Sequence, residues 1–233
     1  MTDAAVVVGG VSGIGAAVVE RQRAADVEVV VWDLAEGADV VCDVADADQV
    51  DAAMTETLDR VGAPTVVTIT AGIGHGGLLA DVSTDEWDRL FGVNARGVWL
   101  AMRALAAPMV AGKGGSIVVV SSVSGRLADQ GMGLYCASKA ALDMIVRVAA
   151  LEWAPSVRVN AVGPGVTDTA MLGRAPRDGA WLTKVAQRSA LGRLGRPDDI
   201  AEAILGLHRM GWVTGQVLEC DGGLGLASPI TGF

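Results

Sequence analysis

The 233-residue sequence lacks any cluster of basic residues. Its formal net charge is −9 and its pI is about 4.6. A protein that binds nucleic acid or an anionic membrane surface usually carries a basic patch, so we expect neither partner. Its three cysteines, Cys42, Cys136 and Cys220, are scattered without the spacing of metal ligands or of a disulfide framework. We therefore expect no metal site, and free cysteines buried in the core of a cytoplasmic protein.

The sequence also lacks a segment typical of a targeting signal or a membrane span. Residues 1–19 have no basic start, continuous apolar stretch or cleavage site, and glycines and Ser12 interrupt them. No repeat, low-complexity tract or linker divides the chain. A chain of this length buries roughly 70 to 75% of its unfolded surface as one open α/β domain. We therefore expect a single domain over residues 1–233.

A glycine-rich turn is the first distinctive feature that the sequence does have. The apolar run 4–8 leads into Gly9-Gly10-Val11-Ser12-Gly13-Ile14-Gly15, and a helical pattern follows. Such a turn brings backbone N–H groups and the positive end of a helix up to a phosphate, and side chains at Gly9, Gly13 or Gly15 would block the approach. The cluster alone is also compatible with a simple tight turn.

Asp33 follows the second apolar run, 27–32. At this distance from the glycine turn, an acidic side chain accepts hydrogen bonds from the ribose hydroxyls of an adenosine group and repels a 2′-phosphate. No Lys or Arg follows at Leu34 or Ala35, and none lies in the glycine turn. The pattern favours NAD over NADP, although Asp33 also fits a turn residue that closes a strand.

Tyr135 and Lys139 are four residues apart, which places them on one face of a helix. A neighbouring ammonium favours the phenolate and lowers the pKa of a tyrosine from about 10. Tyr135 would then exchange a proton with an alcohol or a ketone. By chance the same spacing also occurs on many exposed helices.

The rest of the chain alternates apolar runs with helical patterns, which predicts an α/β fold. We expect a single Rossmann-type, doubly wound domain whose parallel sheet of about seven strands is flanked by helices. The expected strands span 4–8, 27–32, 39–42, 65–70, 117–120, 157–162 and 216–219, and the later helices 46–61, 83–109, 135–153 and 197–210. Sites in such sheets lie beyond the carboxyl ends of the strands. Gly9, Asp33, Ala71, Ser122 and Pro164 all lie at or just past these ends.

In order and spacing, these motifs resemble those of the short-chain dehydrogenase/reductase family over nearly the whole chain. Ser122 lies thirteen residues before Tyr135, and Asn94 matches the asparagine that completes the family's catalytic tetrad. The resemblance implies that Tyr135 is the general acid/base and that Lys139 lowers its pKa and binds the nicotinamide ribose. It further implies that Ser122 holds the substrate oxygen and that Asn94 positions a water which links Lys139 to solvent.

The resemblance also implies NAD as the cofactor and assigns its contacts. They are Gly9, Ser12, Gly13, Ile14, Gly15, Asp33, Leu34, Asp43, Val44, Ala71, Gly72, Tyr135, Lys139, Pro164, Gly165, Thr167 and Thr169. The chain departs from the family pattern at Val8, where threonine is common, and at Thr70, where asparagine is common. A threonine hydroxyl can make part of the hydrogen bonds of the missing amide.

On the substrate side, the resemblance places a lid at about residues 170–195, which otherwise fits a surface helix and loop. The expected substrate contacts are Leu127, Met132, Leu134, Met171, Leu172 and Trp181. These apolar residues favour a hydrophobic secondary alcohol or ketone as the small-molecule partner. His75 is a further candidate, or else a solvated loop histidine.

The family usually pairs its two long helices between subunits, so we expect a homo-oligomer, a dimer or a tetramer, formed through residues 85–109 and 135–153. Two alternatives stay open for function. One is an NADPH-dependent ketoacyl-type reductase, and the other is a non-catalytic NAD(H)-binding sensor or scaffold.

Overall fold

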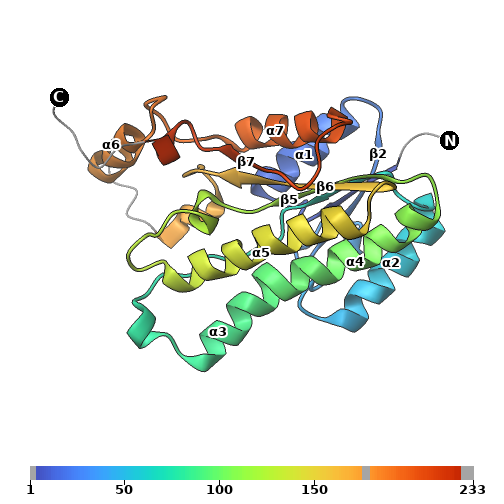
Figure 1. Ribbon diagram of the computed structural model, residues 1–233, viewed down its shortest axis with the longest axis horizontal. Helices are drawn as coiled ribbons and strands as arrows, with labels where there is room; N and C mark the ends of the chain where they lie inside the picture. Colours follow the sequence, from blue (N-terminus) through green and yellow to red (C-terminus); the bar gives the residue numbers. More distant parts are fainter. Residues whose placement is uncertain (1–3, 175–178, 227–233) are drawn as a thin grey trace.

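The computed structural model describes residues 4–174 and 179–226, which form three layers with a sheet in the middle (Figure 1). Its seven strands lie in the order β3-β2-β1-β4-β5-β6-β7, and every neighbouring pair is parallel. The strands are β1 (Ala4–Val8), β2 (Glu28–Asp33), β3 (Val40–Val41), β4 (Val66–Ile69), β5 (Gly115–Val120), β6 (Val157–Pro164) and β7 (Val217–Cys220). This topology confirms the predicted Rossmann-type fold.

Helices cover both faces of the sheet, because strands buried on both sides need apolar partners on each. One face carries α2 (Ala47–Val61), α4 (Val98–Ala111) and α5 (Gly133–Glu152), and the other carries α1 (Gly13–Arg23) and α7 (Pro197–Arg209) (Figure 1). Two separate apolar clusters fill the two interfaces; Val6 and Leu105 belong to one, and Val7 and Ile204 to the other. Adjacent residues of β1 therefore anchor opposite layers.

Local sequence signals explain where several helices begin. Asp46 caps α2 by accepting hydrogen bonds from the backbone N–H groups of Asp48 and Gln49. Ser83 and Glu86 form a capping box at the start of α3 (Thr84–Phe91). Both caps agree with the helix starts expected from the sequence.

One predicted helix is not continuous. The expected helix 83–109 is divided into α3 and α4 by a π-helical segment, η2 (Gly92–Gly97). A Cβ atom added at Gly97 would lie 2.9 Å from the Val44 carbonyl oxygen, so only glycine allows this close approach to the loop after β3. The wider π turn changes the direction of the side chains after α3, and Asn94 is fully buried there.

Smaller differences concern the ends of elements. β3 is only Val40–Val41, β6 continues to Pro164, and α5 begins two residues earlier than predicted, at Gly133. The predicted lid contains the 3₁₀ turn η4 (Ala170–Arg174) and helix α6 (Gly179–Arg188), while residues 175–178 of it lie outside the described residues. Among the described residues, no helix has the length and apolar character needed to cross a bilayer.

Candidate active site

Because all seven strands are parallel, their carboxyl ends meet at one edge of the sheet. This edge brings together the glycine turn after β1, Asp33 at the end of β2, Ala71 after β4, Ser122 after β5 and Pro164 at the end of β6. The predicted cofactor and catalytic residues therefore come from five strand ends that adjoin one another, at the place where open α/β sheets bind ligands.

The turn after β1 is packed too closely for side chains. Gly9 has a φ of +83°, and a Cβ atom added there would lie 2.8 Å from the backbone nitrogen of Ala71. A Cβ atom at Gly15 would lie 2.1 Å from the Gly9 carbonyl oxygen. The first turn of α1 holds no acidic residue, and its N-cap Ser12 makes no capping bond with its side chain in the described structure. The amide end of α1 therefore fits the diphosphate of a dinucleotide.

Thr70, which stands where the family commonly has asparagine, still hydrogen-bonds the neighbouring strand. Its hydroxyl lies 2.8 Å from the Gly9 carbonyl oxygen and 3.1 Å from that of Val8, so it joins the end of β4 to the end of β1. This agrees with the expectation that a threonine hydroxyl makes part of the missing hydrogen bonding.

Asp33 holds the glycine turn in place. Its Oδ2 accepts a hydrogen bond of 3.0 Å from the Val11 N–H, and its Oδ1 accepts one of 3.1 Å from the Ala35 N–H. The second bond is the turn contact considered from the sequence, and the first fixes the carboxylate beside the expected adenosine site. The nearby Arg23 pairs with Asp39 at 3.3 Å, which engages its charge away from Asp33.

Two further predicted adenosine contacts differ in their surroundings. Leu34 is 65% exposed beside Asp33. Asp43 closes a turn, since its Oδ1 accepts a hydrogen bond of 2.9 Å from the Ala45 N–H. The side chain of Val44 is buried in the core, so only its backbone is available to a ligand.

The loop after β6 lies opposite the glycine turn. A Cβ atom at Gly165 would lie 2.8 Å from the Asp221 Cα, and Thr167 donates a hydrogen bond of 3.1 Å to the Gly165 carbonyl oxygen. The side chain of Thr169 lies 3.6 Å from a Cβ atom added at Gly13. The predicted diphosphate and carboxamide contacts are therefore the two sides of one site.

Tyr135 and Lys139 lie buried on the inner face of α5, 9% and 3% exposed. The Ser122 hydroxyl lies close enough to the Tyr135 phenol to favour its ionised form, and the Lys139 ammonium lies 5.8 Å from the Tyr135 ring centroid. Gly72 lies against the same ammonium, since a Cβ atom added there would be 3.5 Å from Nζ. The structure thus brings together Ser122, Tyr135 and Lys139 as the sequence predicts.

Burial shifts the pKa of both Tyr135 and Lys139. Burial raises the pKa of Tyr135, although the nearby Ser122 hydroxyl acts in the opposite direction. Burial also lowers the pKa of Lys139 to about 8, partly opposed by Asp143. Lys139 donates its hydrogen bond, 3.0 Å long, to the Val120 carbonyl oxygen. Burial of the phenol is the largest of these effects on Tyr135, and the lowering of its pKa by Lys139 stays a prediction.

Asn94 joins two segments of the site through its side-chain amide. Its Oδ1 accepts a hydrogen bond of 2.8 Å from the Ile73 N–H, and its Nδ2 donates to the Ile73 carbonyl oxygen at 2.9 Å. Nδ2 also lies 3.2 Å from the Ser138 hydroxyl, which donates to the Tyr135 carbonyl oxygen at 2.8 Å. Asn94 therefore fixes the loop after β4 to the turn of α5 that carries Tyr135, and its predicted role in positioning a water stays a prediction.

Comparison with known proteins decides the family. The profile of a family described as "Enoyl-(Acyl carrier protein) reductase" matches residues 9–225. A cis-4-hydroxycyclohexanecarboxylate dehydrogenase from Sinomonas cyclohexanicum is 35% identical, over 94% of this chain and 95% of that protein. The chain belongs to the short-chain dehydrogenase/reductase family.

Other relatives and solved structures agree. A 2,5-dichloro-2,5-cyclohexadiene-1,4-diol dehydrogenase from Sphingobium indicum is 33% identical over 94% of each chain. A 3-oxoacyl-[acyl-carrier-protein] reductase from Thermotoga maritima is 36% identical over 79% of this chain and 75% of that protein. The ligand-free aldohexose dehydrogenase of Thermoplasma acidophilum superposes with a TM-score of 0.92, at 28% identity, over 99% of this chain and 97% of that one. As a short-chain dehydrogenase/reductase, the protein is an oxidoreductase for alcohol or carbonyl groups with a nicotinamide cofactor.

The predicted substrate contacts of this short-chain dehydrogenase/reductase occupy different environments. Leu134 is 1% exposed and packs with Leu90 and Tyr135, so it stabilises the start of α5 and does not line a pocket. Met132 packs partly against the same cluster, and Leu127 is half-buried. The structure contradicts the prediction for Leu134, because consecutive residues of a helix point in different directions and Leu134 packs against Leu90.

Lid residues approach the site from the other side. Met171 is 52% exposed, and its Cγ lies 3.4 Å from a Cβ atom added at Gly74 in the loop after β4. Leu172 and Trp181 are half-buried. The far end of α6 is linked to the loop before Tyr135, since Arg188 lies 3.7 Å from Asp129.

His75 lies in the loop after β4 and is turned toward α3. Its Nε2 is 3.6 Å from Oε1 of Glu86, and its side chain is 13% exposed. The histidine is therefore not simply solvated, and this orientation toward α3 does not support a substrate contact.

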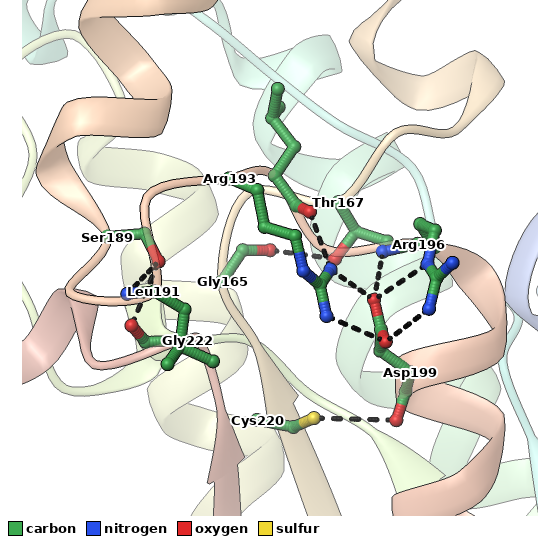
Figure 2. A network of polar contacts seen from close by, with 10 residues as sticks. Gly165, Thr167, Ser189, Leu191, Arg193, Arg196, Asp199, Cys220 and Gly222 are labelled. Atoms are coloured by element: carbon green, nitrogen blue, oxygen red, sulfur yellow. Dashed lines mark hydrogen bonds and ion pairs between the residues drawn. The ribbon is translucent and has the colours of Figure 1, made fainter.

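A polar network that was not predicted from the sequence connects residues 189–196, after α6, to α7 and to the loop after β7 (Figure 2). Ser189 donates a hydrogen bond of 2.9 Å to the Gly222 carbonyl oxygen after β7. Asp199 accepts two hydrogen bonds from Arg193, at 2.6 and 3.0 Å, and one of 2.7 Å from the Arg196 N–H. These bonds hold the pKa of Asp199 far below its usual range. The sequence could have indicated this role, because Asp199 is the third residue of α7, a position at which a carboxylate often caps a helix.

Proposed function

We propose that this short-chain dehydrogenase/reductase is an NAD-dependent dehydrogenase of hydrophobic secondary alcohols. The observation that carries the proposal is the grouping of half-buried Ser122 with buried Tyr135 and Lys139, beside a glycine turn that Asp33 fixes. It supports proton transfer at Tyr135, next to a dinucleotide whose ribose would face Asp33.

In the proposed reaction, an alcohol is oxidised to a ketone. Ser122 and Tyr135 hold the hydroxyl oxygen, and the Tyr135 phenolate accepts the hydroxyl proton as the carbonyl forms. Lys139 stabilises that phenolate by its charge, which counts for more in a site that excludes water. A nicotinamide dinucleotide held by the glycine turn, Asp33 and Lys139 would supply the acceptor for the hydride of the carbinol carbon. The protein contributes position, since reacting groups held in contact react as one unit.

The proposed preference for NAD rests on Asp33. A carboxylate at the end of β2 accepts hydrogen bonds from ribose hydroxyls and repels a 2′-phosphate. Arg21 and Arg23, the basic residues of α1, are already paired with Asp198 and Asp39. Asp33→Ala should shift kcat/KM toward NADP, and Glu28→Ala, which removes an exposed carboxylate from the other end of β2, is the matched control. An unchanged preference in Asp33→Ala would contradict the assignment.

We further propose an alicyclic alcohol as the substrate. Two relatives, at 35% and 33% identity, are named for alcohols on six-membered carbon rings. The apolar side chains of Met171 and Leu127 border the expected substrate side and suit such a ring.

The test is NADH formation from NAD over a panel of secondary alcohols, with cyclohexanols and cyclohexenediols beside open-chain alcohols of equal carbon number. Tyr135→Phe is assayed alongside and should abolish turnover while NADH binding, followed by fluorescence, persists. A substrate oxidised equally by Tyr135→Phe would refute the role of the phenol.

The same panel separates the alternatives. Faster turnover of a 3-oxoacyl thioester with NADPH would favour a ketoacyl-type reductase. Cofactor binding without turnover of any substrate would favour the sensor or scaffold.

We also propose that the protein is a cytoplasmic homo-oligomer, a dimer or a tetramer that pairs α4 and α5 between subunits. The outer face of these helices exposes Trp99, Met144, Val148 and Leu151 at 38, 55, 42 and 82%. A hollow of about 440 Å³ lies on this face, between Trp99 and Trp153. Exposed apolar side chains grouped in this way mark a contact surface. Light scattering tests the proposal, and Met144→Glu should yield monomers while Glu152→Gln should not.

A further inference from the structure

A second buried charge lies on α5, one helical turn beyond Lys139. Asp143 is 6% exposed, and the spacing of four residues places it on the same inner face as Tyr135 and Lys139. A Cβ atom added at Gly125 would lie 2.6 Å from its Oδ2, so the carboxylate lies directly under η3 (Val123–Gly125), the turn that follows Ser122. A glycine at this position leaves room for the acid.

The carboxylate is only partly satisfied by its neighbours. Its Oδ1 is buried and has no hydrogen-bond partner of good geometry among the described residues, and neither has the Ser121 hydroxyl. Ser121 is nevertheless close enough to favour the charged form of Asp143. A buried carboxylate with an unused acceptor needs a compensating positive charge.

The charged groups around Asp143 come from α5 and β7. Lys139 and Arg147 on α5 favour its ionised form, whereas Glu219 on β7 opposes it. Glu219 is in turn bound by Arg126, whose Nη2 lies 2.6 Å from Oε2. The net effect of these neighbours favours a negative Asp143, while burial raises its pKa.

Among the described residues, Asp143 is the charged group that favours the ammonium form of Lys139. Its ammonium makes one described hydrogen bond, to the Val120 carbonyl oxygen, and Asp143 is the acid that opposes the effect of its burial. An ammonium has three donors, so one hydrogen bond leaves part of its charge to be balanced by other groups.

We propose that Asp143 is a positioning residue for the reaction proposed above, and that its buried carboxylate keeps Lys139 in the ammonium form. It acts through Lys139 and does not touch the reacting atoms. Without it, Lys139 loses its proton at a lower pH, and a neutral amine no longer stabilises the Tyr135 phenolate.

Lysine titration by NMR tests the proposal without a substrate. The chain has three lysines, so protein labelled with ¹³C at lysine Cε gives three signals, which Lys113→Arg and Lys184→Arg assign. The Lys139 midpoint should fall by about 1 pH unit in Asp143→Asn. The control Glu152→Gln removes an exposed carboxylate from the same helix and should leave the midpoint in place.

An unchanged Lys139 midpoint in a folded Asp143→Asn would overturn the proposal. Circular dichroism and the other two lysine signals report on folding, and Asp143→Ser replaces the asparagine variant if that variant does not fold. This titration stands whether or not the wild-type protein oxidises an alcohol.

The catalytic consequence is read from the pH dependence of turnover, which rests on the proposed function. Once a substrate is found, the alkaline limb of the kcat profile should move to lower pH in Asp143→Asn and stay in place in Glu152→Gln. A uniform loss of kcat at every pH would assign Asp143 a purely structural part and contradict the proposal.

Discussion

Replacing Asn94 by alanine tests how the π-helical segment supports the site. Asn94 makes three hydrogen bonds, two to the backbone of Ile73 and one to Ser138. At about 1 kcal/mol net per bond, Asn94→Ala should lower the free energy of unfolding by about 3 kcal/mol, and by about 5 if both Ile73 groups stay buried and unpaired. Equilibrium unfolding in urea measures this loss.

Asn160 provides a matched control. It is also fully buried, and its side chain bonds backbone groups of Val213 and Gln216, at 2.9 and 3.0 Å, beside β7. Asn160→Ala should cost about 2 kcal/mol for its two bonds. Both variants remain folded at assay temperature only if the wild type exceeds these losses, so activity is compared at equal folded fraction.

Activity separates the two asparagines. Because Asn94 fixes the loop beside Lys139 and the turn of Tyr135, its loss should lower kcat/KM at least about tenfold, since small displacements of reacting groups are costly. Asn160→Ala should stay within about twofold. The reasoning would be refuted if Asn94→Ala lost less than 1 kcal/mol, or if both variants lost activity equally.

Three further predictions concern stability and protonation. His208 hydrogen-bonds the hydroxyls of Thr68 and Ser116, and burial lowers its pKa to about 3. The residue is half-buried, and both ring nitrogens are hydrogen-bonded. Between pH 6.5 and 3 this histidine is therefore protonated in the unfolded chain but neutral in the folded protein. Calorimetry should therefore show that the free energy of unfolding decreases as the pH is lowered, by at most about 3 kcal/mol between pH 7 and 4. His208→Gln should flatten that dependence, and an equal slope in both proteins would contradict it. Tyr135 is the single tyrosine, so the tyrosinate absorbance of the ligand-free protein should titrate above pH 10, and a midpoint below this value would contradict its desolvation. Asp199→Ala should lower the free energy of unfolding by about 1 to 2 kcal/mol in urea, because it breaks the bonds to Arg193 and the start of α7. Asp198→Ala, which removes an exposed partner of Arg21, should change the free energy of unfolding by less than about 1 kcal/mol. Equal losses in the two variants would show that the Asp199 network does not stabilise the fold.

Much of the fold followed from local patterns. Buried parallel strands are continuous apolar runs, and the glycine turn, Asp46 and Ser83 mark helix starts, so the order of elements was predictable. The break at Gly92–Gly97 was not, because the helical pattern continues through it, and the close approach of Gly97 to Val44 depends on a segment distant in sequence.

The site divides in the same way. Motif spacing predicted the grouping of Ser122, Tyr135 and Lys139, since it depends on strand ends and one helix face. It did not predict the raised pKa of Tyr135 or the carboxylate of Asp143 under Gly125, because burial depends on how several distant segments pack together.

The two faces of α5 have a consequence for how the protein is handled. Tyr135 and Lys139 lie on its inner face, and the exposed side chains of Met144, Val148 and Leu151 lie on its outer face. The same helix thus connects the proposed catalytic residues to the surface that subunits would share. If dilution separates the subunits, the outer face of α5 loses its packing partner, and turnover per molecule should fall before the chain unfolds. Protein concentration is then a variable of every rate measured on this enzyme.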